Sequence, residues 1–255
     1  MKIITLVKVV PKEIEFDKES KRIKRSKENI INPSDLIAVG NAVELKNKYG
    51  FEIDAVSMAP VEAKDTLLKL FDFGIDRIFL LTDPAFANSD VFSTSNVLSR
   101  FILNFDNDFN FIFTGNYSSD GLTGLLPGEV ASKLSILYIS NVLSVNYLDG
   151  SLLAEKIEKD SLHLLKVLSK AVVSFSDRSD KKALPNLYYI FDENEKHLEI
   201  ITNETLKLSQ DEIGKIGSKT VVNELFEVET VQSNELIKEI GDKIIVDIIS
   251  KEVLK

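Results

Sequence analysis

The chain has 255 residues, a formal net charge of −9 and no cysteine. Its length suits one large α/β domain, or one domain with an appendage. The missing cysteines exclude disulfides, zinc–thiolate sites, iron–sulfur sites and a cysteine nucleophile. With only two histidines, His163 and His197, neither a His-rich metal site nor a Ser–His–Asp triad is expected. The acidic balance argues against nucleic acid as a main partner.

The first ten residues, MKIITLVKVV, run into PKEIEFDKE without a small-residue cleavage site. No run approaches the ~20 apolar residues that span a bilayer. We therefore expect a cytoplasmic protein that does not insert into membranes.

Apolar runs alternate with helical patterns along the first half of the chain. Ile3–Val10 predicts a buried strand, and the charged stretch 12–29 predicts an exposed hairpin or excursion. INPSD predicts a helix start, with Asn32 as a candidate cap, and the helix should end at Gly50. Further strands are expected at 51–60, 76–83 and 109–115, and further helices at 61–74, 89–103 and 122–134, the second of these capped by Ser89 or Asp90.

This alternation, with uniformly apolar strands, predicts a parallel, doubly wound α/β sheet with helices on both faces. Ligands of such sheets bind at the carboxyl ends of the strands. Four segments should therefore converge on one crevice: Lys8–Pro11, Ser57–Pro60, Asp83–Asp90 and Thr114–Gly124.

From about Ser140 the pattern changes to strands joined by turns, with a β-hairpin turn at Asp149-Gly150. After Asp177 the chain becomes polar and irregular, and residues 232–254 have helical periodicity. The apolar cluster LYYIF at 187–191 would be costly in water. Either a partner chain or its own domain should cover it.

The loop TGNYSSDGLTG lies between a predicted strand and a predicted helix, where α/β folds hold phosphates, yet it has no Lys or Arg. Backbone N–H groups at a helix start can hold a phosphate alone, aided by the helix dipole. Its glycines allow close approach, and its Ser and Thr residues offer hydroxyls. A cation is therefore useful there but not required.

The chain carries six segments in a characteristic order: KIITLVKVVP, INPSDLIAVGNAVELK, VSMAP, FDFGIDRIFLLTD, TGNYSSDGLTG and KALPNLYYI. Over nearly the whole chain, this series resembles the beta subunit of electron-transfer flavoproteins. The stretch LLTDPAFANSDVFSTSNVL resembles the anaerobe type, which includes flavin-bifurcating members. The resemblance implies an adenine-nucleotide-hydrolase-like α/β domain at 1–180, with a C-terminal β-hairpin region. Residues 181–255 would form a recognition loop and an extended arm that packs on the alpha subunit.

The resemblance further implies a heterodimer whose alpha subunit carries the redox FAD, with AMP or a second FAD in this chain. The implied nucleotide-binding residues are Leu6, Lys8, Asn32, Asp35, Met58, Asp90, Thr94, Gly115, Asn116, Asp120, Gly121, Leu122, Thr123, Gly124, Leu125 and Leu126. Leu184, Pro185 and Asn186 resemble the segment that anchors partner dehydrogenases of the acyl-CoA type. No side chain is expected to act as general acid, base or nucleophile, because the flavin would supply the redox chemistry.

Some residues depart from the family pattern. Asn116-Tyr117 replaces a Lys/Arg-Gln pair, and Leu122 replaces an acid. Tyr117 could stack on a ring, Lys8 could bind phosphate or pair with a carboxylate, and Asp120 could contact a ribose or cap the following helix.

Three functions remain open. The first is an electron-carrier subunit rather than a stand-alone enzyme. The second is an NADH-oxidising, flavin-bifurcating component, favoured by the 81–98 stretch and opposed by the altered 115–122 loop. The third is a nucleotide-binding regulatory module, against which the LPN segment argues. A flavin count would separate the first two.

Overall fold

The computed structural model describes residues 1–17, 22–25, 28–159, 161–192 and 196–220. In this part of the chain, nine strands form one sheet in the order β11-β10-β9-β12-β8-β1-β6-β7-β13. Their bounds are β1 (Lys2–Leu6), β6 (Glu52–Met58), β7 (Arg77–Leu81), β8 (Phe111–Gly115), β9 (Leu137–Leu148), β10 (Ser151–Glu158), β11 (Ser161–Val167), β12 (Ala171–Phe175) and β13 (His197–Ile201).

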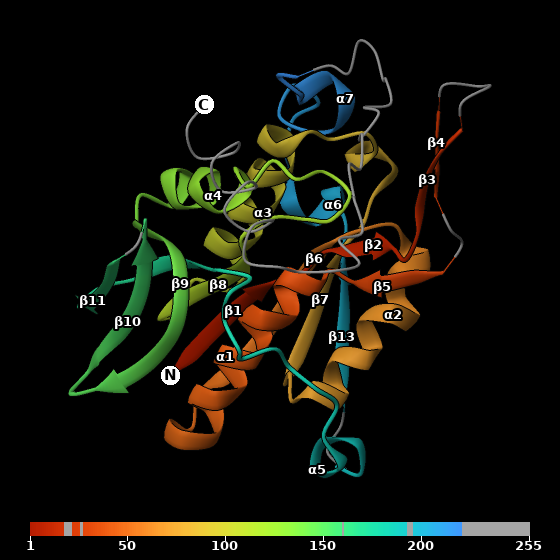
Figure 1. Ribbon diagram of the computed structural model, residues 1–255. Helices are drawn as coiled ribbons and strands as arrows, with labels where there is room; N and C mark the ends of the chain where they lie inside the picture. Colours follow the sequence, from red (N-terminus) through yellow and green to blue (C-terminus); the bar gives the residue numbers. More distant parts are fainter. Residues whose placement is uncertain (18–21, 26–27, 160, 193–195, 221–255) are drawn as a thin grey trace, which may run out of the picture.

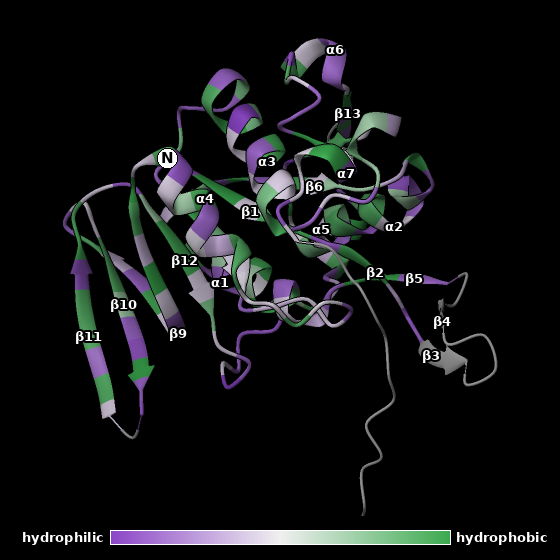
Figure 2. Ribbon diagram, turned by 90° about the horizontal axis from the view of Figure 1, so that it is seen from above, coloured by the Kyte–Doolittle hydropathy of each residue, from purple (hydrophilic) through white to green (hydrophobic). Residues whose placement is uncertain are grey.

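The sheet is parallel from β9 through to β13 and antiparallel at the β9–β10–β11 end. The β9–β10 turn has positive φ at both Asp149 and Gly150, as the predicted hairpin turn requires. In Figure 2, β1 is mainly hydrophobic, whereas β10 and β11 alternate between hydrophobic and hydrophilic residues. A mainly hydrophobic β1 matches a central strand covered on both faces. β11, by contrast, is exposed over most of its length and is buried only at Val167.

Helices cover both faces of the sheet (Figure 1). The longer helices are α1 (Pro33–Tyr49), α3 (Val91–Phe105) and α4 (Leu126–Leu134). The shorter ones are α2 (Lys64–Leu68), α5 (Leu187–Ile190), α6 (Asn203–Leu206) and α7 (Gly214–Gly217), with 3-10 turns η1 (Val61–Ala63), η2 (Lys69–Phe73) and η3 (Pro84–Phe86). The predicted doubly wound α/β fold is confirmed.

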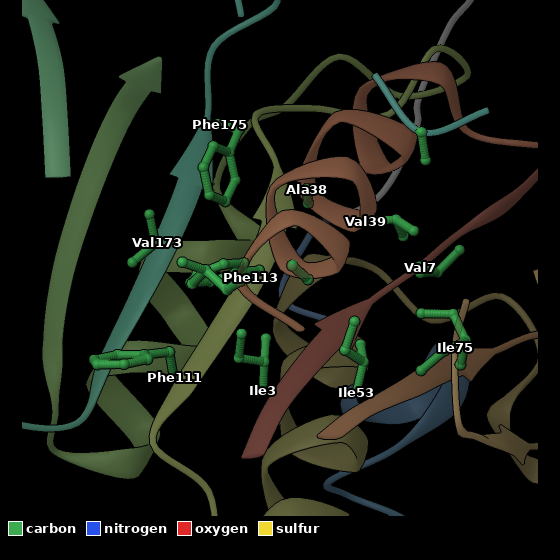
Figure 3. Packing of buried hydrophobic residues seen from close by; sticks show 14 of the residues in the cluster. Ile3, Val7, Ala38, Val39, Ile53, Ile75, Phe111, Phe113, Val173 and Phe175 are labelled. Atoms are coloured by element: carbon green, nitrogen blue, oxygen red, sulfur yellow. The ribbon is translucent and has the colours of Figure 1, made fainter. Parts of the chain in front are cut away.

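Alternate residues of each strand enter two separate cores. Ile3 packs with Ala38 of α1, and Ile4 packs with Phe101 of α3 on the opposite face. Figure 3 shows the α1 side of the sheet, where Ile53, Phe113 and other strand residues lie beneath this helix. Burying each such side chain contributes ~1.5–3 kcal/mol, which fixes α1 on the sheet.

Two small sheets complete the described part of the fold. β2 (Val9–Pro11) pairs with β5 (Asn29–Ile31), and β3 (Ile14–Asp17) pairs with β4 (Arg22–Arg25). The β3–β4 hairpin extends from the body in Figure 1, which confirms the hairpin expected within 12–29.

Some element bounds differ from the sequence prediction. The first strand ends at Leu6 rather than Val10, because the Lys8 N–H donates to the Asp35 carboxylate instead of continuing the ladder. α4 begins at Leu126 rather than 122, because Leu122 and Gly124 have positive φ angles that no α-helix accepts. The segment expected as one helix at 61–74 consists of α2 between two 3-10 turns.

The C-terminal part of the described chain packs on the α/β core. β13 pairs in parallel with β7, which the sequence does not predict, and Leu206, Leu208 and Ile213 join the α3-side core. The helix expected at 232–254 lies outside the described residues. The division at residue 180 stays a prediction.

Candidate functional site

The strands β1, β6, β7 and β8 end at one edge of the sheet, because they run parallel. The four segments expected to converge all follow these strands. α1 begins at the same edge, where the Asn32 N–H donates to the Lys8 carbonyl over 2.9 Å. The α1 start and the loop after β8 therefore face each other at the place where α/β sheets bind ligands.

Asp35, in the first turn of α1, joins the ends of two strands. Its carboxylate accepts the Lys8 N–H over 2.7 Å and the Gly115 N–H over 3.1 Å. Asp35 is only 6% exposed. Burial raises the pKa of Asp35 to about 7, although these two N–H groups act in the opposite direction. Asp35 therefore holds backbone at the site and has almost no surface for a ligand.

Asn32 holds the loop after β8 rather than capping its own helix. It occupies the predicted N-cap position of α1, but its side chain makes no capping hydrogen bond. Its amide instead donates to the Tyr117 carbonyl over 2.9 Å and accepts the Ser119 N–H over 3.1 Å. This double contact fixes the path of residues 117–119, and it leaves the amide occupied by the protein.

Lys8 lies beside the same loop. Its ammonium group contacts the Asp120 carboxylate at 2.5 Å and the Ser118 hydroxyl at 3.3 Å. Of the two roles expected for Lys8, phosphate binding or pairing with a carboxylate, the structure therefore shows the pairing with a carboxylate. Asp120 does not cap α4, whose N-cap position is Leu125 with no side-chain bond. About half of the Lys8 side chain is exposed, so its ammonium group can reach an anion that enters the loop.

The loop reaches α4 with a run of available amides. Within the described residues, the backbone N–H groups of Thr123, Gly124, Leu125 and Leu126 have no hydrogen-bond acceptor. The left-handed conformations at Leu122 and Gly124 turn the chain into the helix here. Consecutive free N–H groups at a helix start form a concave, positively polarised site for an anion. Leu122 and Leu125 are exposed around this site.

The other predicted nucleotide residues lie at neighbouring strand ends. Leu6 is buried in the α3-side core, and Met58 is half-buried against it. Asp90 caps α3 by accepting the Ser93 N–H, which confirms one of the two predicted caps. Thr94, in the first turn, donates its N–H to the Asp90 carbonyl.

Asp90 also binds a segment that sequence reasoning did not connect with it. Its carboxylate accepts the N–H groups of Lys219 and Thr220 over 2.7 and 2.8 Å, and the Thr220 hydroxyl over 2.9 Å. Burial acts to raise the pKa of Asp90, but these bonds and the one from Ser93 outweigh it and lower the pKa. The carboxylate is thus engaged by its own chain.

The predicted partner segment lies near the C-terminal end of α1, whereas the nucleotide loop lies at its start. Leu184 is 74% exposed, and the Asn186 side chain caps α5 by accepting the Tyr188 N–H. Of the cluster 187–191, only Tyr189 is buried, and its hydroxyl donates to Asn47 of α1. The chain's own α/β domain therefore covers one ring of the cluster, while Leu187, Tyr188 and Phe191 are exposed. A cavity of about 260 Å³ lies next to them and is lined by residues of α1, by 180–184, and by Phe73, Asn186 and Tyr189.

The described residues contain no group of three or more His, Cys, Asp or Glu side chains that could hold a metal ion. No helix among them is both long and apolar enough to cross a membrane.

The fold and this edge define a doubly wound α/β protein with a loop suited to anions. The family described as "Electron transfer flavoprotein domain" matches residues 21–180. An electron transfer flavoprotein subunit beta of Thermoanaerobacterium thermosaccharolyticum is 30% identical over 226 residues, which cover 87% of this chain and 86% of the relative. Protein FixA of Azotobacter vinelandii is 30% identical over 203 residues, covering 77% and 72%.

A third relative is an acryloyl-CoA reductase electron transfer subunit gamma of Anaerotignum propionicum, 28% identical over 236 residues that cover 89% of this chain and 88% of the relative. The chain therefore belongs to the electron transfer flavoprotein family. Within it, the chain is similar to the beta-subunit and FixA proteins, which supports an electron-transfer function.

Proposed function

We propose that this chain is the beta subunit of a heterodimeric electron-transfer flavoprotein. Its alpha subunit carries the FAD that exchanges electrons, and this chain holds AMP or the adenosine diphosphate part of a second FAD. The observation that carries the proposal is the row of amides at 123–126, which have no acceptor among the described residues, on the carboxyl edge of a parallel sheet.

The residues at this edge divide into two groups in the proposal. Gly121, Leu122, Thr123, Gly124, Leu125 and Leu126 border the phosphate, with Lys8 in reach of it. Asn32, Asp35 and Gly115 support the loop from behind, since their polar groups bond to the protein. The lost cation at Asn116 is offset in part by Lys8, which must exchange Asp120 for the phosphate. Hydrogen bonds to charged groups are worth ~1.5–3 kcal/mol each, so this exchange is energetically accessible.

We further propose that the electron donor is an acyl-CoA-type dehydrogenase. Leu184, Pro185 and Asn186 would contact it, because Leu184 is exposed beside other exposed apolar side chains. The printed name of the Anaerotignum propionicum relative, an electron transfer subunit of acryloyl-CoA reductase, supports a partner of this chemistry.

A bifurcating role is the second candidate. The 81–98 stretch favours it, and Asp90 and Thr94 of that stretch lie at the start of α3. In that case, the second nucleotide is FAD, and NADH reduces the complex. AMP in its place would exclude bifurcation.

The test compares two glycines that both have positive φ, Gly124 in the loop and Gly150 in the β9–β10 turn. A left-handed conformation costs an alanine ~1–2 kcal/mol at either position. Gly124→Ala should weaken AMP binding by about tenfold, because the loop relaxes away from its left-handed path. Gly150→Ala should leave AMP binding unchanged.

AMP binding is measured by calorimetry on the complete heterodimer after its nucleotides have been removed. Equal affinities of the two variants would count against the loop as the binding site.

A further inference from the structure

The start of α1 holds the nucleotide loop residue by residue. Asp35 accepts the Gly115 N–H, and Ser34 accepts the Asn116 N–H over 3.0 Å. Asn32 then contacts the Tyr117 carbonyl and the Ser119 N–H. Three polar side chains at the start of α1 thus bind backbone groups at positions 115, 116, 117 and 119 of the loop.

Asp177, which follows β12, binds both the start of α1 and the loop. One of its carboxylate oxygens accepts the Ser34 hydroxyl over 2.8 Å, and the other accepts the Tyr117 hydroxyl. The bond to this carboxylate raises the pKa of Tyr117, so the hydroxyl keeps its proton. Ser34 uses its hydroxyl hydrogen for Asp177 and its oxygen for Asn116, which orders the three groups into a chain.

We propose that Ser34 and Asp177 are positioning residues for the nucleotide site, acting through Asn116 and Tyr117 without touching the nucleotide. The inference rests on the proposed function and deepens it. Asp177 carries a negative charge and would repel a phosphate, so a direct ligand role does not explain its place beside the loop.

The physical benefit is preorganisation. A glycine- and serine-rich loop loses much conformational freedom when a ligand orders it, and that loss weakens binding. The loop lacks the cation that would add affinity at Asn116. Fixing its backbone before the nucleotide arrives raises affinity without any additional ligand contact. It also gives Tyr117 a structural role, because its hydroxyl donates to Asp177.

The test uses the full chain in complex with its alpha subunit, stripped of nucleotide and titrated with AMP. The variants are Tyr117→Phe, Asp177→Ala and the double variant. Tyr49→Phe is the matched control. Tyr49 is the last residue of α1, at the opposite end from the loop, and its hydroxyl also donates to a side-chain oxygen, that of Asn146. Tyr117→Phe and Asp177→Ala should each weaken AMP binding by about tenfold. The double variant should bind no more weakly than Asp177→Ala, since both changes remove the same bond.

A second measurement follows amide hydrogen exchange in the nucleotide-free complex. Ser34→Ala and Tyr117→Phe should speed exchange at Asn116 and Ser119, while the control leaves it unchanged. Additive losses of affinity, or affinities equal to the control, overturn the proposal. If the wild-type complex binds neither AMP nor FAD, the proposed function fails. Exchange then decides the positioning claim alone, and unchanged exchange in both variants overturns it.

Discussion

Gly40, in the middle of α1, is where the helix touches the segment that leads to the proposed docking loop. A Cβ atom at this position would lie 1.6 Å from the Lys181 carbonyl oxygen and 2.8 Å from the Ala183 nitrogen. The Ala183 N–H donates to the Leu36 carbonyl over 2.9 Å. Gly40→Ala must therefore push residues 181–183 off the helix and stretch or break this bond.

The expected magnitude is a balance of opposing contributions. Replacing a helical glycine by alanine ordinarily stabilises by ~0.5–1 kcal/mol. Overpacking costs ~1–3 kcal/mol, and the lost backbone hydrogen bond costs a further ~0.5–1.5 kcal/mol. A net destabilisation of ~1–3 kcal/mol should lower Tm by roughly 3–9 °C for a chain of this size.

Thermal unfolding of the full chain measures this effect, with Gly128→Ala in α4 as the control. The Cβ atom there would meet only Tyr138 ring carbons at 3.5 and 3.6 Å, so this variant should unfold at the same temperature or higher. In the heterodimer, Gly40→Ala should slow electron transfer from the dehydrogenase while AMP affinity is kept, because Leu184 follows the displaced segment directly. A Tm for Gly40→Ala equal to or above that of the wild type would show that the contact between α1 and residues 181–183 does not constrain this position.

Two further predictions concern buried charges. Burial raises the pKa of Asp35 from 3.8 to about 7, so the folded protein binds this proton more tightly than the unfolded chain does. The free energy of unfolding should therefore fall as pH rises from about 4 to 7 and then level off. Relative to Asp35→Asn, the wild type should lose ~4 kcal/mol at most across that window in denaturant titrations, and parallel pH profiles would contradict this. Lys2 pairs with the buried carboxylate of Asp106 at 2.5 Å, and Lys2→Met should destabilise by ~2 kcal/mol. Lys48→Met, which removes an exposed pair with Glu44, should leave the unfolding midpoint unchanged, and equal effects of the two lysine variants would argue against the buried pair.

The sequence predicts the layered sheet because each element carries its own local signal. Apolar runs such as FIFTG and the periodic helix after Pro33 have one stable arrangement each, and the parallel crossovers then order them. β13 escapes prediction for the opposite reason. Its five residues, HLEII, follow a polar stretch, and their place is decided by pairing with β7, about 120 residues away in the chain.

The sequence predicts which strand ends form the candidate site, but it does not predict the hydrogen bonds within the site. Topology alone places Lys8 and the loop after β8 at one edge. That Asn32 binds the loop instead of its own helix depends on how far the loop lies from the helix, which no spacing in the sequence encodes. Ser34 and Asp177 resemble ordinary helix-start and loop residues, so only their hydrogen bonds across the fold distinguish them.

The nucleotide content of the purified wild-type heterodimer shows directly whether this chain holds a nucleotide. The complex is denatured, and the released FAD and AMP are separated by chromatography and counted against protein. We expect two nucleotides per heterodimer, one FAD from the alpha subunit and either one AMP or one further FAD from this chain. A single FAD with no second nucleotide would contradict this, because the amides at 123–126, which have no acceptor among the described residues, would then hold no nucleotide.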